Sequence, residues 1–297
     1  MNETAISEPR SEYYKSQRIR MHYAVWGDGS KPPLILIHGG QDHCRNWDFV
    51  APGLVDNYAI YAPDLRGHGD SGWAVGGMYS FPEFVLDVAT LANSIDGPLT
   101  IIGHSLGGAI ALQYAGTFPE KVERLVAIEG WGPPMVEHQP AYARMRNWID
   151  HMHEMERRKP RHYENVEDAT KRMMEANPHL TVPMARHLTF YGTRRNDDGT
   201  LSWKFDNYVR LRSPFEFNIA DAKEIWSKIT APVLLIKGTE SWALDPEKDG
   251  RASVISDRRT VIIEQAGHWV HHDQLDRVMD AILEFLAEGN TSAGGLA

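Results

Sequence analysis

The sequence predicts an α/β protein, with a mostly parallel central β-sheet flanked by helices and a mainly helical cap. Three observations support this fold class. Strand-sized apolar runs alternate with helix-like stretches across residues 11–130 and again across 228–290. An apolar strand at 99–102 passes through a tight turn into a helix rich in Ala and Gly. Across residues 131–227 the alternation stops and the composition changes.

We therefore expect residues 11–130 and 228–290 to form one core, with residues 131–227 as a cap inserted between them. The insert holds most of the 11 methionines and many aromatic residues. Because Met side chains adapt to irregular apolar surfaces, part of this insert should cover a hydrophobic substrate. Residues 1–10 and 291–297 are expected to be flexible ends.

Composition excludes several classes of function. A formal net charge of −9 disfavours binding to nucleic acid. The single cysteine, Cys44, cannot form an internal disulfide, which is typical of a reducing compartment. We expect it to be a buried structural thiol. No apolar run approaches the roughly 18–20 residues of a membrane span, and residues 1–20 lack the apolar centre of a signal peptide. We expect a cytoplasmic protein; its oligomeric state is left open.

The core elements follow from local patterns. Period-two alternation, or a continuous apolar run, predicts strands at 13–26 (a pair), 34–37, 58–62, 99–102, 122–129, 232–236 and 260–263. Helical spacing and caps predict four helices in the core. One spans residues 47–54, one begins at the Ser80–Glu83 capping box, one follows Ser105, and one runs from Asp273 to Gly289. In the insert we expect a helix over 142–155, two more capped by Asn165 and Thr181, and a hairpin at Asp198-Gly199.

The turn after the strand at 99–102 carries a nucleophile motif. Gly103-His104-Ser105-Leu106-Gly107 fits G-x-S-x-G, in which a side chain at either glycine would collide with neighbouring backbone. The turn lifts Ser105 Oγ clear of the sheet. It also points the Leu106 N–H, at the start of a helix, toward the place of a substrate oxygen.

With three further segments, His38-Gly39-Gly40, Asp64-Leu65-Arg66-Gly67-His68-Gly69 and Gly267-His268, the chain resembles the α/β-hydrolase superfamily outside the insert. It looks like a serine carboxylesterase with a helical lid. The resemblance implies that Gly40 supplies the second backbone donor of an oxyanion hole, beside Leu106, with Gln41 as the alternative. It also implies structural roles for Asp64, Arg66 and an exposed His68.

Ser105 needs a base, and His268 is the candidate among 14 histidines. It follows a predicted strand and a glycine, resembles the histidine loop of the family, and comes after the serine in the required chain order. His271 and His272 are the alternatives, although neither follows a glycine.

The acid departs from the commoner family pattern. Many relatives carry Asp at the position that is Ser241 here, and a serine cannot hold a negative charge. A branch resembling the haloalkane dehalogenases takes its acid from the end of the strand after the nucleophile's helix, where this chain has Glu129. We expect Glu129 to be the acid, with Glu240 and Asp245 as alternatives.

The expected reaction is hydrolysis of carboxylic esters of small to medium hydrophobic substrates through an acyl-enzyme. A serine nucleophile argues against dehalogenase or epoxide hydrolase chemistry, which uses Asp in relatives. The alternatives are a C–C bond (meta-cleavage product type) or lactone hydrolase and, from another class, a ligand-binding receptor with vestigial activity.

The expected partners are a hydrophobic ester and water, with no cofactor and no metal. His151 and His153 do not suggest a metal site, because residues two apart on a helix face different directions. The predicted substrate pocket is lined by Gln41, His104, Trp131, Trp148 and Trp269.

Overall fold

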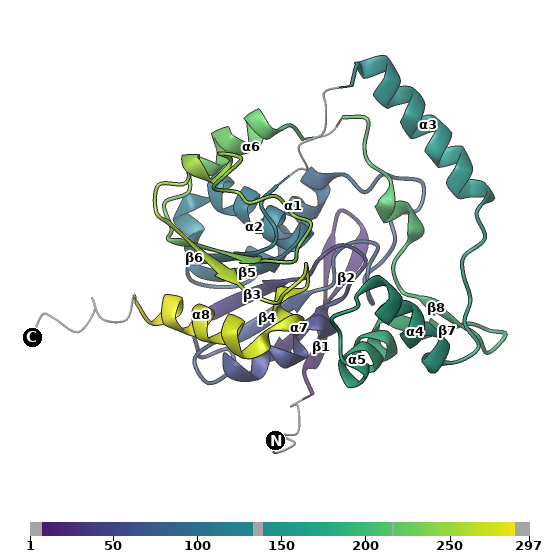
Figure 1. Ribbon diagram of the computed structural model, residues 1–297, viewed down its shortest axis with the longest axis horizontal. Coiled ribbons are helices and arrows are strands. Elements are labelled where there is room, and N and C mark those ends of the chain that lie inside the picture. Colours follow the sequence, from purple (N-terminus) through teal and green to yellow (C-terminus); the bar gives the residue numbers. More distant parts are fainter. Residues whose placement is uncertain (1–7, 133–138, 216, 289–297) are drawn as a thin grey trace, which may run out of the picture.

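A computed structural model describes residues 8–132, 139–215 and 217–288. Its centre is an eight-stranded sheet in the order β1-β2-β4-β3-β5-β6-β9-β10, with helices on both faces (Figure 1). The strands are β1 (Arg10–Ser16), β2 (Ile19–Trp26), β3 (Pro33–Ile37), β4 (Ala59–Pro63), β5 (Leu99–His104), β6 (Val122–Ile128), β9 (Val233–Gly238) and β10 (Arg258–Ile263). The predicted strands are confirmed.

The sheet is parallel from β4 to β10, and only the β1–β2 and β2–β4 pairs are antiparallel. Parallel strands are buried on both faces, and β3, β5 and β6 carry the continuous apolar runs that this requires. Their carboxyl ends meet at one edge of the sheet, where sites form in open α/β proteins.

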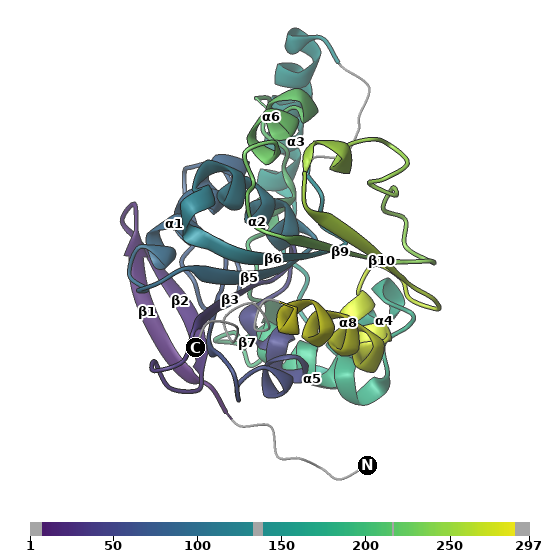
Figure 2. The same ribbon diagram turned by 90° about the vertical axis from the view of Figure 1, so that its left-hand side faces the viewer.

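Two apolar clusters cover the two faces of the sheet. Figure 2 shows the helices that lie on either side of it. One face packs against α1 (Phe81–Ala92), α2 (Leu106–Thr117) and α6 (Ile219–Trp226). The other packs against α8 (Leu275–Ala287) and the short 3-10 turns η1 (Cys44–Phe49) and η2 (Ala51–Gly53). The predicted capping box is present, since Ser80 N donates to Glu83 Oε2 at 3.1 Å.

Three local predictions were wrong. Residues 47–54 form the turns η1 and η2 in place of an α-helix, since Pro52 lacks the N–H that a continuous helix would use. The terminal helix begins earlier, as α7 (Val270–Asp273), and breaks at Gln274 before α8. His68 is fully buried, where an exposed side chain was expected.

The insert contains α3 (Ala141–Arg157), α4 (Val166–Ala176), α5 (Val182–Gly192), the hairpin β7 (Thr193–Arg195) and β8 (Leu201–Trp203), the 3-10 turn η4 (Asn207–Arg210) and α6. Asn165 caps α4 by accepting from Asp168 N, and Thr181 precedes α5. In Figure 1, α3 stands away from the sheet while α4 and α5 lie close to the core. The division into core and cap stays our prediction.

Some expectations fall outside the described residues. These include the end of the last helix at Gly289 and most of the predicted flexible ends, although Arg10 already begins β1. Among the helices that the structure describes, none combines the length and the apolar character needed to cross a membrane.

Candidate active site

Ser105 lies on a strained turn between β5 and α2, with φ 52° and ψ −117°. A β-carbon added to Gly103 would lie 2.3 Å from Gly107 O, and one added to Gly107 would lie 2.1 Å from Ile37 O. Both contacts are with backbone atoms, which cannot move aside as a flexible side chain could. The two glycines are therefore required by the turn, as the motif predicts.

Ser105, His268 and Glu129 are in contact in that order. Ser105 Oγ lies 2.9 Å from His268 Nε2, and His268 Nδ1 lies 3.3 Å from Glu129 Oε2. A proton on Nδ1, facing the carboxylate, leaves Nε2 free to accept the serine proton. The structure thus brings the predicted nucleophile, base and acid together in an arrangement suited to nucleophilic attack.

Glu129 follows β6 in a left-handed backbone conformation, with φ 53°. Its side chain is buried and accepts two further hydrogen bonds, from Gly238 N to Oε1 at 2.7 Å and from Ser241 Oγ to Oε2 at 2.5 Å. Both donors belong to the end of β9 and the loop after it. A buried carboxylate needs such partners, and here they also fix its direction toward His268.

The alternative acids lie elsewhere. Glu240 is half exposed and pairs with His179 at 3.4 Å, and Asp245 pairs with Lys248 at 3.6 Å. The partner of Glu240 lies between α4 and α5, and that of Asp245 lies in the loop after β9. Among the described carboxylates, only that of Glu129 bonds to His268.

The alternative bases also face away from the serine. His271 is fully buried, and its Nε2 bonds to Asn46 Oδ1 at 2.9 Å. Burial, with the nearby histidines, lowers the pKa of His271 well below its usual value. His272 is buried against Phe49 and Trp269. Neither imidazole bonds to Ser105 within the described part of the chain.

The loop after β3 lies beside the serine. A β-carbon added to Gly39 would lie 3.2 Å from Ser105 Cβ, and one added to Gly40 would lie 4.0 Å from Leu106 Cδ2. Gly40 and Gln41 donate no backbone hydrogen bond to any described residue, and Leu106, as the first residue of α2, has no helical acceptor. These N–H groups are available to a developing oxyanion.

The residues predicted to line one substrate pocket lie at different places in the structure. His104 is fully buried, and its Nε2 donates to His268 O at 2.9 Å, so it supports the histidine loop and lines no open pocket. Burial, together with His268, lowers its pKa well below the usual value, which keeps the ring neutral. Trp131 is buried and donates to Leu244 O.

Of the other two tryptophans, Trp148 lies in α3 of the insert and Trp269 lies in the core segment directly before α7. Trp148 lines a small cavity beside Tyr79 and Tyr208, and Trp269 packs against the α5 side chains Ala185 and Leu188. Sequence reasoning missed Trp242, whose ring centroid lies 4.5 Å from that of His268 and whose side chain is 77% exposed. Its place three residues after Gly238-Thr239, directly after Ser241, would have been the signal.

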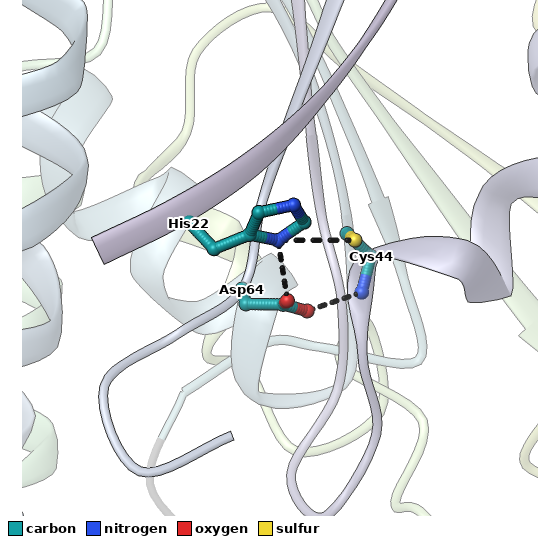
Figure 3. A group of neighbouring side chains, drawn as sticks. All are labelled: His22, Cys44 and Asp64. Atoms are coloured by element: carbon teal, nitrogen blue, oxygen red, sulfur yellow. Dashed lines mark hydrogen bonds and ion pairs between the residues drawn. The ribbon is translucent and has the colours of Figure 1, made fainter. Parts of the chain in front are cut away.

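Asp64, directly after the end of β4, anchors a buried polar cluster (Figure 3). His22 Nδ1 and Cys44 N each donate to its carboxylate at 2.7 Å, and Cys44 Sγ lies 3.9 Å from the same imidazole nitrogen. Burial alone would raise the pKa of Asp64, but the hydrogen bond and charge of His22 outweigh it and hold the pKa below its usual value.

These three side chains are close enough to hold a metal ion. However, burial raises the pKa of Cys44 well above its usual value, which disfavours the thiolate that a metal would need. Asp64 is also fully used as a hydrogen-bond acceptor, with Asp70 N as a further donor. The donor set fits a structural anchor better than a metal centre, in line with the structural roles expected for Asp64 and Cys44.

Comparison with known proteins supports the fold. The alpha/beta hydrolase family model matches residues 34–281. An esterase of Mycobacterium tuberculosis is 30% identical over 283 residues, covering 92% of this chain and 88% of that protein. A serine hydrolase-like protein of Danio rerio is 28% identical over 274 residues, covering 88% and 83%. The solved thioesterase domain from the curacin biosynthetic pathway has a TM-score of 0.80 at 24% identity, covering 93% of this chain and 99% of that one.

Proposed function

Since the chain belongs to the alpha/beta hydrolase family, we propose that it is a serine hydrolase cleaving carboxylic esters of small to medium hydrophobic substrates. The observation that carries this proposal is the unbroken contact from Ser105 Oγ through His268 to the buried carboxylate of Glu129. The similarity to an esterase at 30% identity supports it. A cytoplasmic location stays a prediction from the sequence.

Each residue has a role in the proposed reaction. Ser105 Oγ attacks the ester carbonyl while His268 Nε2 takes the serine proton, and Glu129 stabilises the resulting imidazolium. The Gly40 and Leu106 N–H groups hold the oxyanion of the tetrahedral intermediate. Removal of one such donor typically costs about a hundredfold or more in rate.

The intermediate then collapses. His268 protonates the departing alkoxide, which leaves an ester bond between the acyl group and Ser105. Water attacks this acyl-enzyme with His268 again acting as base, releasing the acid and the free serine. No cofactor takes part in this sequence of steps. Ser241 and Gly238 keep the carboxylate of Glu129 directed at the imidazole throughout.

The test is hydrolysis of p-nitrophenyl acetate and p-nitrophenyl octanoate by the wild type and three variants. Ser105→Ala removes the nucleophile and Glu129→Gln neutralises the proposed acid. Glu240→Gln is the matched control, because it neutralises a nearby carboxylate that pairs with His179. Circular dichroism and thermal melting establish that each variant is folded.

We expect the first two variants to lose at least about a hundredfold in kcat/KM, and Glu240→Gln to stay within about threefold. Near-full activity of Glu129→Gln would rule out Glu129 as the acid. An inert wild type would rule out the esterase, and a lactone and a vinylogous diketone in the same panel would then test lactone and C–C hydrolysis. Ligand binding that survives Ser105→Ala without wild-type turnover would favour a receptor.

A further inference from the structure

A second cavity, of about 420 Å³, lies in the cap region. It is bounded by the end of α3, by α4, by the β7–β8 hairpin and by η4, and Trp73 of the core also lines it. Figure 1 shows these segments grouped on the far side of the core from the C-terminal end of α8. Ser105, His268 and Glu129 are absent from the described residues that line it.

The lining of this cavity is strongly cationic. Six basic side chains contribute to it, namely Arg158, Lys159, Arg161, Arg172, Arg194 and Arg210. Asp206 is the opposing carboxylate among the lining residues that the structure describes, and it is buried and already accepts from Tyr79 Oη and Tyr208 N. In a chain with a net charge of −9, this local excess of positive charge is an exception to the overall balance.

Most of these cations have no acidic partner in the part of the chain that the structure describes. Within the described residues, Arg158, Arg161, Arg194 and Arg210 form no ion pair with a carboxylate. Arg172 does pair with Glu175 at 3.0 Å, but both side chains are largely exposed, so the pair is weak. Burial, together with the charges of Arg158 and Arg172, lowers the pKa of Arg210, which indicates that these cations repel one another.

Aromatic rings lie between the arginines. Trp73, Tyr163, Trp203, Phe205 and Tyr208 all line the cavity. The rings of Trp203 and Phe205 are nearly parallel, at 12°. The guanidinium of Arg194 lies 4.7 Å from the Trp73 ring centroid, and that of Arg210 lies 5.2 Å from Phe205. Cation–π contacts hold the arginines in place without neutralising their charge.

Arginine is the side chain best suited to phosphate, because its planar fork donates two parallel hydrogen bonds. Aromatic faces bind flat rings by stacking. We propose that this cavity binds a small organic anion that carries phosphate groups and a planar ring, with the phosphates against Arg158, Arg194 and Arg210. The inference does not depend on the proposed esterase activity.

The cavity favours a small molecule over a nucleic-acid strand. Its volume is within the usual range for ligand pockets, and the basic residues converge on one concavity. A polymer would need a long basic track, and the rest of this acidic chain would repel its phosphates. The anion is either a separate ligand or the carrier group of the substrate, and the experiment below distinguishes the two.

The test is isothermal titration calorimetry of the full chain with ADP, adenosine and pyrophosphate as probes. We expect ADP to bind at least about tenfold more tightly than adenosine, which lacks the phosphates, or pyrophosphate, which lacks the ring. Raising NaCl from 50 to 500 mM should weaken ADP binding at least about fivefold, because the contacts are ionic.

The variants Arg194→Gln and Arg210→Gln should each weaken ADP binding at least about fivefold. Arg195→Gln is the matched control: it removes the same charge one residue along β7, where the side chain faces away from the cavity and bonds to Gly199 O. It should stay within about twofold of the wild type. Thermal melting shows that each variant remains folded.

Three results would overturn the proposal: no saturable binding of ADP up to 1 mM, adenosine binding as tightly as ADP, or equal ADP binding by wild type, Arg194→Gln and Arg210→Gln. Hydrolysis of butyryl-coenzyme A, an acyl thioester on a nucleotide carrier, tests whether the anion is a separate ligand or part of the substrate. Competition by ADP would identify the substrate's own carrier, whereas ADP binding without any effect on that hydrolysis would identify a separate ligand.

Discussion

Ser241 Oγ donates a 2.5 Å hydrogen bond to Glu129 Oε2, the same carboxylate oxygen that faces His268 Nδ1. Ser241 is the position at which the family resemblance led us to expect an acid. The ends of β6 and β9 are neighbours in the sheet, so two positions far apart in sequence reach one place beside the imidazole. The serine thus helps to direct the carboxylate of Glu129, the acid that we propose, toward the imidazole.

This relationship predicts that the acid can be moved. In the double variant Glu129→Gln with Ser241→Asp, a carboxylate at 241 should reach His268 and raise kcat/KM at least about tenfold above that of Glu129→Gln alone. The measurement is kcat/KM on p-nitrophenyl acetate, with pH profiles for all variants.

The matched control for the moved acid is Glu129→Gln with Ser241→Asn, which keeps the size of the new side chain but not its charge. It should remain as inactive as Glu129→Gln. Equal activity of the Asp and Asn double variants would show that charge at this place is not what His268 requires.

The turn at the nucleophile predicts a severe effect of Gly103→Ala. The added methyl group would lie 2.3 Å from Gly107 O, which forces the backbone of the turn apart and displaces Ser105. We expect a loss of at least about a hundredfold in kcat/KM or a large drop in melting temperature. In Gly29→Ala the methyl group meets no atom within 4 Å, so this control should behave as wild type. Normal activity and stability of Gly103→Ala would contradict the observed turn.

The buried ion pair between Arg66 and Asp87 predicts a stability effect. Arg66 Nε lies 2.6 Å from Asp87 Oδ2, and both side chains are about 1% exposed. Asp87→Ala should lower the free energy of unfolding by about 3 kcal/mol, because it leaves a buried guanidinium short of a partner. Urea denaturation measures it.

A surface ion pair provides the comparison for Asp87→Ala. Glu284 lies 3.2 Å from Arg259 and is 70% exposed, so Glu284→Ala should cost less than about 1 kcal/mol. Similar losses in the two variants would mean that burial does not decide the strength of the Arg66 pair.

Asp42 predicts a dependence of stability on pH. Burial raises the pKa of Asp42 to about 7, even though His43 N and the Asn46 amide donate to its carboxylate. Because the pKa is higher in the folded than in the unfolded chain, the folded state is favoured while the group is protonated. That stability is fully present below the unfolded value near 4 and is lost as the pH rises to about 7.

The measurement is urea denaturation at pH 5 and pH 8. Asp42→Asn keeps a neutral side chain at both values. Between pH 5 and pH 8, the free energy of unfolding of this variant should therefore rise by about 2–3 kcal/mol relative to that of the wild type. An equal change with pH in the two proteins would show that Asp42 does not titrate in this range.

Much of this protein could be predicted because the deciding interactions are local. Continuous apolar runs identify parallel strands, and two glycines at fixed spacing around Ser105 identify the turn, since both patterns depend on neighbouring residues. The glycine before His268 likewise marked the histidine that contacts the serine. Where a local signal was weak, as at residues 47–54, proline chemistry produced 3-10 turns in place of the expected helix.

What the sequence by itself determined was the fold class and the candidates Ser105 and His268, through short-range backbone geometry. Tertiary structure decided which carboxylate contacts His268. Glu129, Glu240 and Asp245 all carry a carboxylate, and the position of each segment in the folded chain determines which of them reaches the imidazole. It also buried His104 and assembled the cationic cavity from segments spread over residues 73–210. Long-range packing brings such residues together, and a local sequence pattern does not indicate which distant segments will meet.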